Sequence, residues 1–310
     1  MNITDRCNKT IDFILSLHDN GEFSSLIRDG KSQTKYTPVE WKLALTSVLL
    51  TAGKIFCRDD AAATANIILQ KLESYRFSNQ TLSCLIVDDK SFNPWNAWMS
   101  IIHLKLGNIT DAEMYMSSLL QSIHNEYIPA YFSKVTPDEI FNENYKMQSP
   151  YGIIILSLLF AYLYTDKGSY LLSAKEVGHS AINKSRFDPH DVWGMRLLYD
   201  RFKDPIFKSH AEYVLSQTDA VSILSMASLV ASMVQQSNLA WIKYIPDRIR
   251  RCEEILEYQI SLQSDIGGFF RSRNNNEMRL DYAYQNLLSF IQYQQILQDM
   301  SEKEILGLIV

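Results

Sequence analysis

The stretch QSDIGGFFRSRNNNEMRLDYAY, from Gln263 to Tyr284, decides the expected fold. It follows an amphipathic helix that ends at the glutamine, passes through a glycine pair, two aromatic residues and a polar run, and enters a second helix at Asp281. Glycines and polar residues between two periodic apolar segments mark a turn. The stretch therefore predicts two helices joined as a hairpin.

The rest of the chain shows the same period. Apolar residues recur at i, i+3, i+4 and i+7, which is typical of amphipathic helices, and convincing alternating strands are absent. The clearest helical segments are Val39–Phe56, Ala61–Tyr75, Trp95–Leu106, Asp111–His124, Ile153–Tyr164, Ser173–Ile182, Ala211–Leu215, Ile249–Leu262 and Tyr282–Leu297. Twelve to fourteen helices fit the chain.

Helix starts give a second signal, because a capping residue directly before proline suits an N-cap followed by the first helical position. Such pairs are Thr37-Pro38, Asn93-Pro94, Ser149-Pro150 and Asp188-Pro189. Helical hairpins that repeat at this scale indicate a solenoid or a closed α/α toroid. No flexible linker divides the sequence, so we expect one all-α domain over residues 1–310, an α/α toroid built from helical hairpins.

Composition excludes several classes of protein. The chain has 310 residues, 46% of them hydrophobic and 21% charged, with a net charge of −5, and it lacks the excess of basic residues that a phosphate-backbone binder needs. Its four cysteines form no C-x-x-C pair, so neither a zinc ribbon nor a disulfide framework is indicated. We expect no nucleic-acid partner, no metal and no cofactor.

Two apolar runs, Tyr151–Tyr164 and Val221–Val234, are shorter than the roughly 20 residues that cross a bilayer. They are expected to be buried core helices. The N-terminal residues lack the basic region and apolar run of a secretory signal. A cytoplasmic protein without a membrane span is therefore expected.

The opening stretch carries a family resemblance. Gln263-x-x-x-Gly267-x-Phe269 resembles the Gln-x-x-x-Gly-x-Trp repeat of terpenoid cyclases, with Phe in place of Trp. The continuation to Asp281 is similar to the region of protein prenyltransferase β-subunits that ends in a metal-binding Asp. The resemblance implies an α/α toroid with a central cavity.

The catalytic signatures of both families are missing. Prenyltransferases place a zinc-binding Cys two residues after the Asp, where this chain has Ala283, and the Asp-x-Asp-Asp group of class II cyclases does not occur. The resemblance therefore implies the fold and a reaction without zinc, and leaves the chemistry open.

Four residues are candidates for acid and base chemistry. Asp281 opens the last long helix beside arginines, and Asp59 and Asp60 are adjacent carboxylates that could share a proton. His190, next to an aspartate at a helix start, supplies an imidazole. Helix capping and favourable charge at helix N-termini are the structural alternative for each of them.

The candidate substrate-binding residues are aromatic or basic. Aromatic side chains just after the helix starts would surround the mouth of a central cavity, and the two arginines would bind an anionic group. They are Trp95, Trp98, Tyr151, Trp193, Arg271, Arg273, Tyr282 and Tyr284. Ordinary packing at helix ends is the alternative.

Three functions remain open. The first is a biosynthetic enzyme of cyclase or transferase type, acting on an apolar substrate such as an isoprenoid, whose cationic intermediates aromatic walls stabilise. The second is a carbohydrate-active hydrolase, lyase or epimerase, in which tryptophans stack on sugar rings and carboxylates do acid and base work. The third is a scaffold that binds a peptide or protein partner without catalysis.

Overall fold

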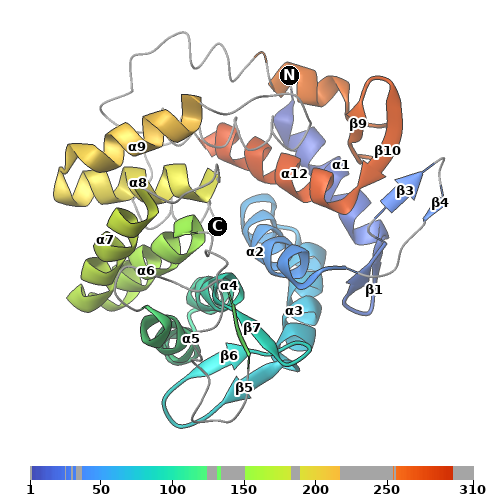
Figure 1. Cartoon of the computed structure of the whole chain (residues 1–310). Coiled ribbons are helices and arrows are strands. Elements are labelled where there is room, and N and C mark those ends of the chain that lie inside the picture. Colours follow the sequence, from blue (N-terminus) through green and yellow to red (C-terminus); the bar gives the residue numbers. More distant parts are fainter. Residues whose placement is uncertain are drawn as a thin grey trace. The chain divides into compact units, whose positions relative to one another are not determined.

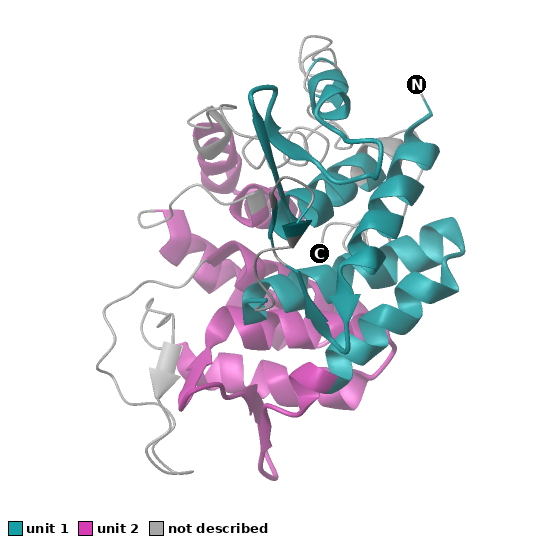
Figure 2. Cartoon of the chain, turned by 90° about the vertical axis from the view of Figure 1, so that its right-hand side faces the viewer, with its two compact units in different colours: residues 1–70, 218–309 teal, residues 71–217, 310 magenta. Residues whose placement is uncertain are grey.

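The computed structural model describes residues 2–24, 26–28, 31–32, 37–123, 131–133, 151–182, 189–216, 254 and 256–295. The chain divides into two compact units, which Figure 2 colours separately. Unit 1 contains Met1–Gln70 and Thr218–Ile309, and unit 2 contains Lys71–Gln217 and Val310. The single domain expected over residues 1–310 stays a prediction.

Unit 1 is built on helices that pack around one long C-terminal helix. Its described helices include α1 (Ile3–Ser16), α2 (Val39–Phe56), most of α3 (Asp59–Glu73) and α12 (Leu280–Gln295), and residues 256–261 are helical as well. Its strands are β1 (His18–Asp19), β2 (Glu22–Phe23), β3 (Leu26–Arg28), β4 (Lys31–Ser32), β9 (Phe270–Ser272) and β10 (Asn275–Arg279). Helix α12 contacts α1 and α2, and the strands form a β1-β2 pair and a four-stranded antiparallel sheet of order β4-β3-β10-β9 (Figure 1).

The stretch that resembles a terpenoid cyclase repeat joins the C-terminal hairpin to α1. The Gln263 side-chain amide donates to the Arg6 carbonyl at 3.0 Å and to the Thr10 hydroxyl at 2.9 Å. Gly267 has φ +94°, and a Cβ there would lie 2.0 Å from the Lys9 carbonyl oxygen. Only glycine combines this backbone conformation with this close approach. In this chain the residues of the repeat therefore hold the C-terminal hairpin against α1.

Unit 2 is a series of helical hairpins. Its helices are α4 (Asn93–Lys105), α5 (Ile109–Ser122), α6 (Tyr151–Thr165), α7 (Gly168–Ile182), α8 (Pro189–Phe202) and α9 (Pro205–Ser216). Its strands are β5 (Arg76–Ser78), β6 (Ser83–Leu85), β7 (Lys90–Phe92) and β8 (Tyr131–Ser133). Each even-numbered helix packs against the helix that follows it, and α6 also contacts α4 and α8 (Figure 1). Helices α4, α6 and α8 thus form a row, and α6 is buried from Tyr151 to Ala161.

The structure confirms an all-α fold and corrects details. Helix α2 has the predicted bounds, but α1 was not predicted, and short strands occur where none were expected. These strands have two to five residues, too few for an alternating pattern to stand out. The Thr37 hydroxyl does not cap α2; it hydrogen-bonds to the backbone of Phe23, and Pro38 takes the N-cap position.

The described helices include none that is long and apolar enough to span a membrane. Helix α6 contains the first of the two apolar runs and lies in the core of unit 2, as predicted. The second run, Val221–Val234, falls outside the described residues.

Candidate functional site

In unit 2 a histidine lies between two tryptophans. His190 is the second residue of α8, and its ring centroid lies 5.6 Å from that of Trp98 on α4 and 5.1 Å from that of Trp193 on α8. The interplanar angles are 90° and 82°, the edge-to-face arrangement that aromatic rings favour. Both tryptophans are buried and His190 is half-buried. The imidazole is thus held in a defined orientation while part of it stays accessible.

A glycine brings the start of α6 against the start of α8. A Cβ on Gly152 would lie 2.2 Å from the Asp191 backbone nitrogen and 2.7 Å from its Oδ1. One turn further along α8, a Cβ on Gly194 would lie 2.9 Å from a methyl group of Ile155. The starts of α6 and α8 therefore meet, Trp98 of α4 lies against His190 at the same place, and the buried Tyr151 directly precedes Gly152 in the sequence.

This place combines an imidazole, two indoles and a carboxylate. Asp191 is 2% exposed and lies in the first turn of α8, where a negative charge is stabilised by the helix dipole. Side chains of neighbouring residues on a helix point in different directions, so the Asp191 carboxylate and the His190 imidazole face different parts of the protein. The arrangement can hold an imidazole for proton transfer beside aromatic walls. We call these residues, Trp98, Tyr151, His190, Asp191 and Trp193, the His190 cluster.

In unit 1 the predicted residue Asp281 forms an ion pair with an arginine that was not in the predicted site. Arg279 Nε donates to Asp281 Oδ1 at 2.9 Å, and Nη2 donates to Oδ2 at 2.7 Å. The guanidinium carbon lies 5.3 Å from the centroid of Trp41 and 5.0 Å from that of Tyr282. Burial raises the pKa of Asp281, and the charge and hydrogen bonds of Arg279 offset this only in part.

The other predicted residues of the C-terminal hairpin lie apart from this ion pair. Arg271 and Arg273 are exposed, and the Arg273 guanidinium lies 5.2 Å from the Tyr258 ring. Tyr284 is buried, which raises the pKa of its phenol. The hairpin thus supplies Arg279 to Asp281, rather than Arg271 or Arg273.

The remaining candidates are placed as follows. Trp95 is buried and packs against Phe92 with ring centroids 4.5 Å apart. Asp59 and Asp60 are exposed at the start of α3, and Asp60 accepts two hydrogen bonds from Arg58 at 2.8 and 2.7 Å. The hydrogen bond from Arg58 holds the pKa of Asp60 below its usual value. A low pKa suits a structural carboxylate better than a proton donor.

Two residues of the Asp281 environment were not among the residues predicted for the site. Arg279 precedes Asp281 by two residues, at the end of β10, where it pairs in register with Leu26 of β3. Trp41 lies in the first turn of α2. An Arg-x-Asp spacing where a strand runs into a helix was the available signal for Arg279, whereas nothing local links Trp41 to a segment more than two hundred residues away.

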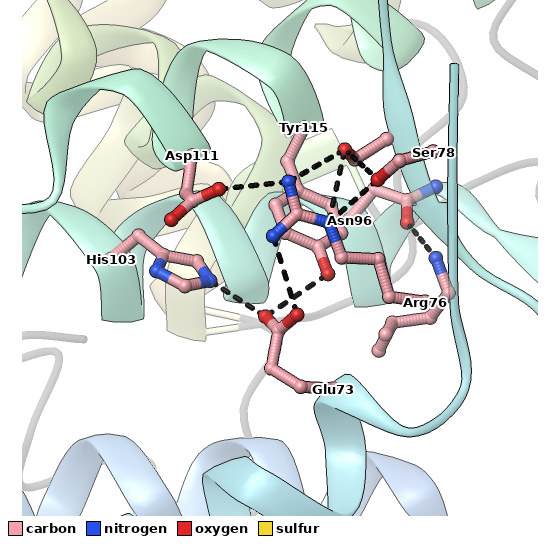
Figure 3. A network of polar contacts seen from close by, with 9 residues as sticks. Glu73, Arg76, Ser78, Asn96, His103, Asp111 and Tyr115 are labelled. Atoms are coloured by element: carbon pink, nitrogen blue, oxygen red, sulfur yellow. Dashed lines mark hydrogen bonds and ion pairs between the residues drawn. The ribbon is translucent and has the colours of Figure 1, made fainter.

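A second polar network in unit 2 was also not predicted, and Figure 3 shows it. His103 Nε2 lies 2.8 Å from Glu73 Oε1, which also accepts a hydrogen bond from the Tyr115 hydroxyl at 3.2 Å. Arg76 pairs with Glu73 at 3.3 Å and with Asp111 at 2.8 Å. These contacts fasten α3, α4, α5 and strand β5 to one another. Among the residues with described positions, no group of three or more His, Cys, Asp or Glu side chains is arranged to hold a metal ion.

Structure comparison shows the fold. The chain is similar to D-mannose isomerase (TM-score 0.71, 11% identity, covering 95% of this chain and 97% of that one). It is similar to cellobiose 2-epimerase from Bacillus thermoamylovorans (TM-score 0.71, 12% identity, 94% and 99%) and to the GH76 α-mannanase BT2949 of Bacteroides thetaiotaomicron (TM-score 0.70, 13% identity, 96% and 98%). The fold is an α/α toroid. No protein-family model and no curated protein matches the sequence.

These likenesses correct the first functional hypothesis. The similar structures are named for enzymes that process sugars, namely an isomerase, an epimerase, mannanases and a glucuronyl hydrolase, and not for an enzyme acting on isoprenoids. The terpenoid cyclase resemblance was right about the toroid, and the hypothesis of an isoprenoid cyclase or transferase is wrong. The physical reason lies in the joint at Gln263 and Gly267, since residues that fasten a hairpin to α1 carry information about packing rather than about a substrate.

Proposed function

We propose that this protein is a carbohydrate-active enzyme that isomerises or epimerises a sugar by proton transfer at carbon, with His190 as acid and base. The observation that carries the proposal is the His190 imidazole held edge-on by Trp98 of α4 and Trp193 of α8, where the starts of α6 and α8 meet. Two enzymes with this fold over nearly their whole length, D-mannose isomerase and cellobiose 2-epimerase, support a sugar as the substrate class.

The chemistry needs a group that takes and returns a proton. The imidazole of His190 takes the proton from the carbon beside the carbonyl of an open-chain sugar, and the electrons of that C–H bond form an enediolate. Return of the proton from the imidazolium to the neighbouring carbon on the same face, with the hydroxyl proton passing from one oxygen to the other, gives the isomer. The epimer forms when the enediolate turns its opposite face to the imidazolium before the proton returns to the same carbon. A positioned acid or base of this kind accelerates such a step by about 10²- to 10⁴-fold.

Trp98 and Trp193 support this role by fixing the imidazole and keeping water from two of its sides. Because both indoles are buried, their orientation is set by the packing of α4 and α8 rather than by a bound substrate. A base held in place before the substrate arrives does not have to be ordered during the reaction.

Hydrolysis fits the described part of the cluster less well. Glycosidases generally use two carboxylates about 5 to 10 Å apart, one on each side of the scissile bond. Among the contacts described for the His190 cluster, Asp191 supplies the single carboxylate. The adjacent pair Asp59 and Asp60 is exposed, and Asp60 is bound by Arg58. An α-1,6-mannanase of this fold is described as inactive when two adjacent aspartates are replaced, so hydrolysis is the second outcome to test.

The test is exchange with solvent deuterium. The protein is incubated in D₂O with D-mannose, D-glucose, D-fructose or cellobiose, and the products are followed by NMR. We expect a new isomer or epimer with deuterium at the carbon that received the proton, and loss of this turnover in His190→Gln. His179→Gln is the matched control, because His179 is an exposed histidine of unit 2 whose ring packs against Phe207 of α9 and not against the His190 cluster.

Three results would contradict the proposal. Full turnover in His190→Gln removes His190 from the reaction. Release of monosaccharide from α-1,6-mannotriose without deuterium at carbon indicates a hydrolase. Neither turnover nor binding of any of these sugars favours the scaffold that binds a peptide or protein partner.

A further inference from the structure

Arg279 in unit 1 is a rigidly held donor. Two of its nitrogens, Nε and Nη2, bind Asp281, and the aromatic rings of Trp41 and Tyr282 lie about equally far from its guanidinium carbon. A guanidinium fixed by a two-point hydrogen bond and by aromatic contacts has few orientations left. The remaining edge of the group therefore points in one defined direction.

The Nη1 edge of the Arg279 guanidinium is available to donate hydrogen bonds. Guanidinium carries five N–H groups, and the two on Nη1 have no acceptor among the described residues. The Arg279 side chain is 34% exposed, whereas that of Asp281 is 5% exposed. The Asp281 carboxylate is thus buried, whereas one end of the Arg279 guanidinium is exposed to solvent.

Stability alone does not account for the pair. Removing a carboxylate from water is costly, and a buried ion pair often contributes no more than apolar residues of the same volume. The raised pKa of Asp281 points the same way, because burial outweighs the effect of Arg279. A buried pair that presents a directed donor is more typical of recognition than of packing.

Charge decides the class of ligand. Asp281 already neutralises the guanidinium, so a carboxylate or phosphate ligand would gain little net charge attraction from the pair to offset the loss of its hydration. A sugar hydroxyl or ring oxygen accepts a hydrogen bond from Nη1 without this penalty. The two fully buried cations of the described part, Lys42 and Arg196, are likewise paired, with Glu22 and Asp200.

We propose that Arg279, held by Asp281 and flanked by Trp41 and Tyr282, is a binding site in unit 1 for an uncharged sugar. The Nη1 donor binds a hydroxyl or ring oxygen, and the half-exposed Trp41 indole offers an apolar surface beside it. The inference rests on the proposed function in one respect, that the ligand is a sugar. It selects neutral hexoses and their oligomers over uronic acids.

Binding is measured separately from turnover. Calorimetry with D-mannose, D-glucose, cellobiose and D-glucuronate is carried out on the wild type, His190→Gln, Arg279→Gln, Arg279→Lys and Arg271→Gln. Arg271 is the matched control, an exposed arginine of the same hairpin. Circular dichroism melting shows whether each variant is folded, and Arg279→Lys keeps the positive charge beside Asp281 if Arg279→Gln does not fold.

We expect the wild type to bind at least one neutral sugar and to bind D-glucuronate at least ten times more weakly. Arg279→Gln and Arg279→Lys should weaken neutral-sugar binding by about 10-fold or more, the usual effect of losing a hydrogen bond from a charged group. Arg271→Gln should bind as the wild type does. His190→Gln should bind within about threefold of the wild type, since His190 is assigned to the reaction.

The outcomes separate the two proposals. Unchanged sugar binding in folded Arg279 variants, tighter binding of D-glucuronate, or no binding of any neutral sugar overturns the inference. Weaker binding in the Arg279 variants together with full turnover in His190→Gln supports the inference and contradicts the proposed function. Weaker sugar binding in the Arg279 variants together with loss of turnover in His190→Gln supports both proposals.

Discussion

Two histidines of unit 2, His103 on α4 and His190 on α8, have contrasting surroundings. His103 is 4% exposed, bonds Glu73 through Nε2 and stacks on Tyr115, with ring centroids 5.6 Å apart and planes at 18°. His190 is half-buried and meets two indoles edge-on. By residue type, His103 with its carboxylate and tyrosine looks more like a catalytic group. Its surroundings indicate the opposite.

The difference shows how the two groups are used. The carboxylate beside His103 also binds Tyr115 and Arg76, so the network in Figure 3 links three helices and a strand, although the buried Nδ1 of His103 has no hydrogen-bond partner among the described residues. The rings around His190 orient the imidazole without covering it. A network of buried hydrogen bonds and ion pairs stabilises one conformation, while an oriented and partly accessible imidazole can act on a ligand.

The largest effect expected at the His190 cluster comes from Gly152→Ala. The new methyl group would overlap the Asp191 backbone, which cannot move aside as a side chain can, so we expect a loss of about 3 kcal/mol or more in the free energy of unfolding. Turnover should fall with it, because the starts of α6 and α8 separate. Urea unfolding and deuterium exchange into the sugar measure the two effects.

Gly194→Ala is the control for that substitution. Its methyl group would meet the Ile155 side chain at 2.9 Å, and a side chain can shift, so about 1 kcal/mol is expected. Equal losses in the two variants would mean that the starts of α6 and α8 are not the tight point of this interface.

Much of the fold could be predicted from the sequence, since apolar period alone located α2 and most of the other helices. The convergence of Trp98, His190 and Trp193 could not, although each residue was a candidate. Residues at helix starts are visible in a sequence, but which starts meet depends on packing between helices. Gly152 and Gly194 carried that information, and a glycine inside an apolar helix pattern is the signal that could have been used.

Asp281 shows a different limit of prediction from the sequence. The sequence places Asp281 among arginines, and the site predicted from it contains Arg271 and Arg273, although Arg279 is nearer along the chain. Strand β10 places Arg279 next to Asp281, while the other two arginines are exposed. Arg279 is the last residue of β10 and Asp281 lies in the first turn of α12, so the pair spans the change from strand to helix, and the short strand was not predicted.

An intermediate effect is expected at the His103 network from Glu73→Gln. Burial acts to raise the pKa of Glu73, but the hydrogen bond and charge of His103, together with Arg76, outweigh it, so the pKa lies below its ordinary value of 4.5. A group whose pKa is lowered by folding stabilises the protein above its unfolded pKa and loses that contribution as pH falls through the folded pKa. Because Glu73 is partly exposed, we expect a loss of about 1 kcal/mol at pH 7 that shrinks below pH 4.5.

Urea unfolding of the wild type and Glu73→Gln between pH 3 and pH 7 measures this dependence, with turnover per folded molecule measured at pH 7. Glu113→Gln is a control, because its partner Lys167 is mostly exposed and the pair should contribute less. Turnover unchanged in Glu73→Gln keeps the two histidines in separate roles. A hundredfold loss of turnover in the folded variant would assign the catalytic function to the His103 network.

The smallest effect is expected from Asp60→Asn, which tests the predicted carboxylate pair at the start of α3. Asp60 is exposed and its hydrogen bonds go to Arg58, which also bonds the exposed Asp12, so the substitution leaves Arg58 with a partner. Exposed ion pairs typically contribute less than about 1 kcal/mol, and the loss of unfolding free energy should stay within that range. Turnover should not change, because a carboxylate held ionised in water by an arginine has no proton to give at neutral pH. A tenfold loss of turnover in folded Asp60→Asn, repeated in Asp59→Asn, would instead place the acid chemistry at α3 and leave the His190 cluster with packing alone.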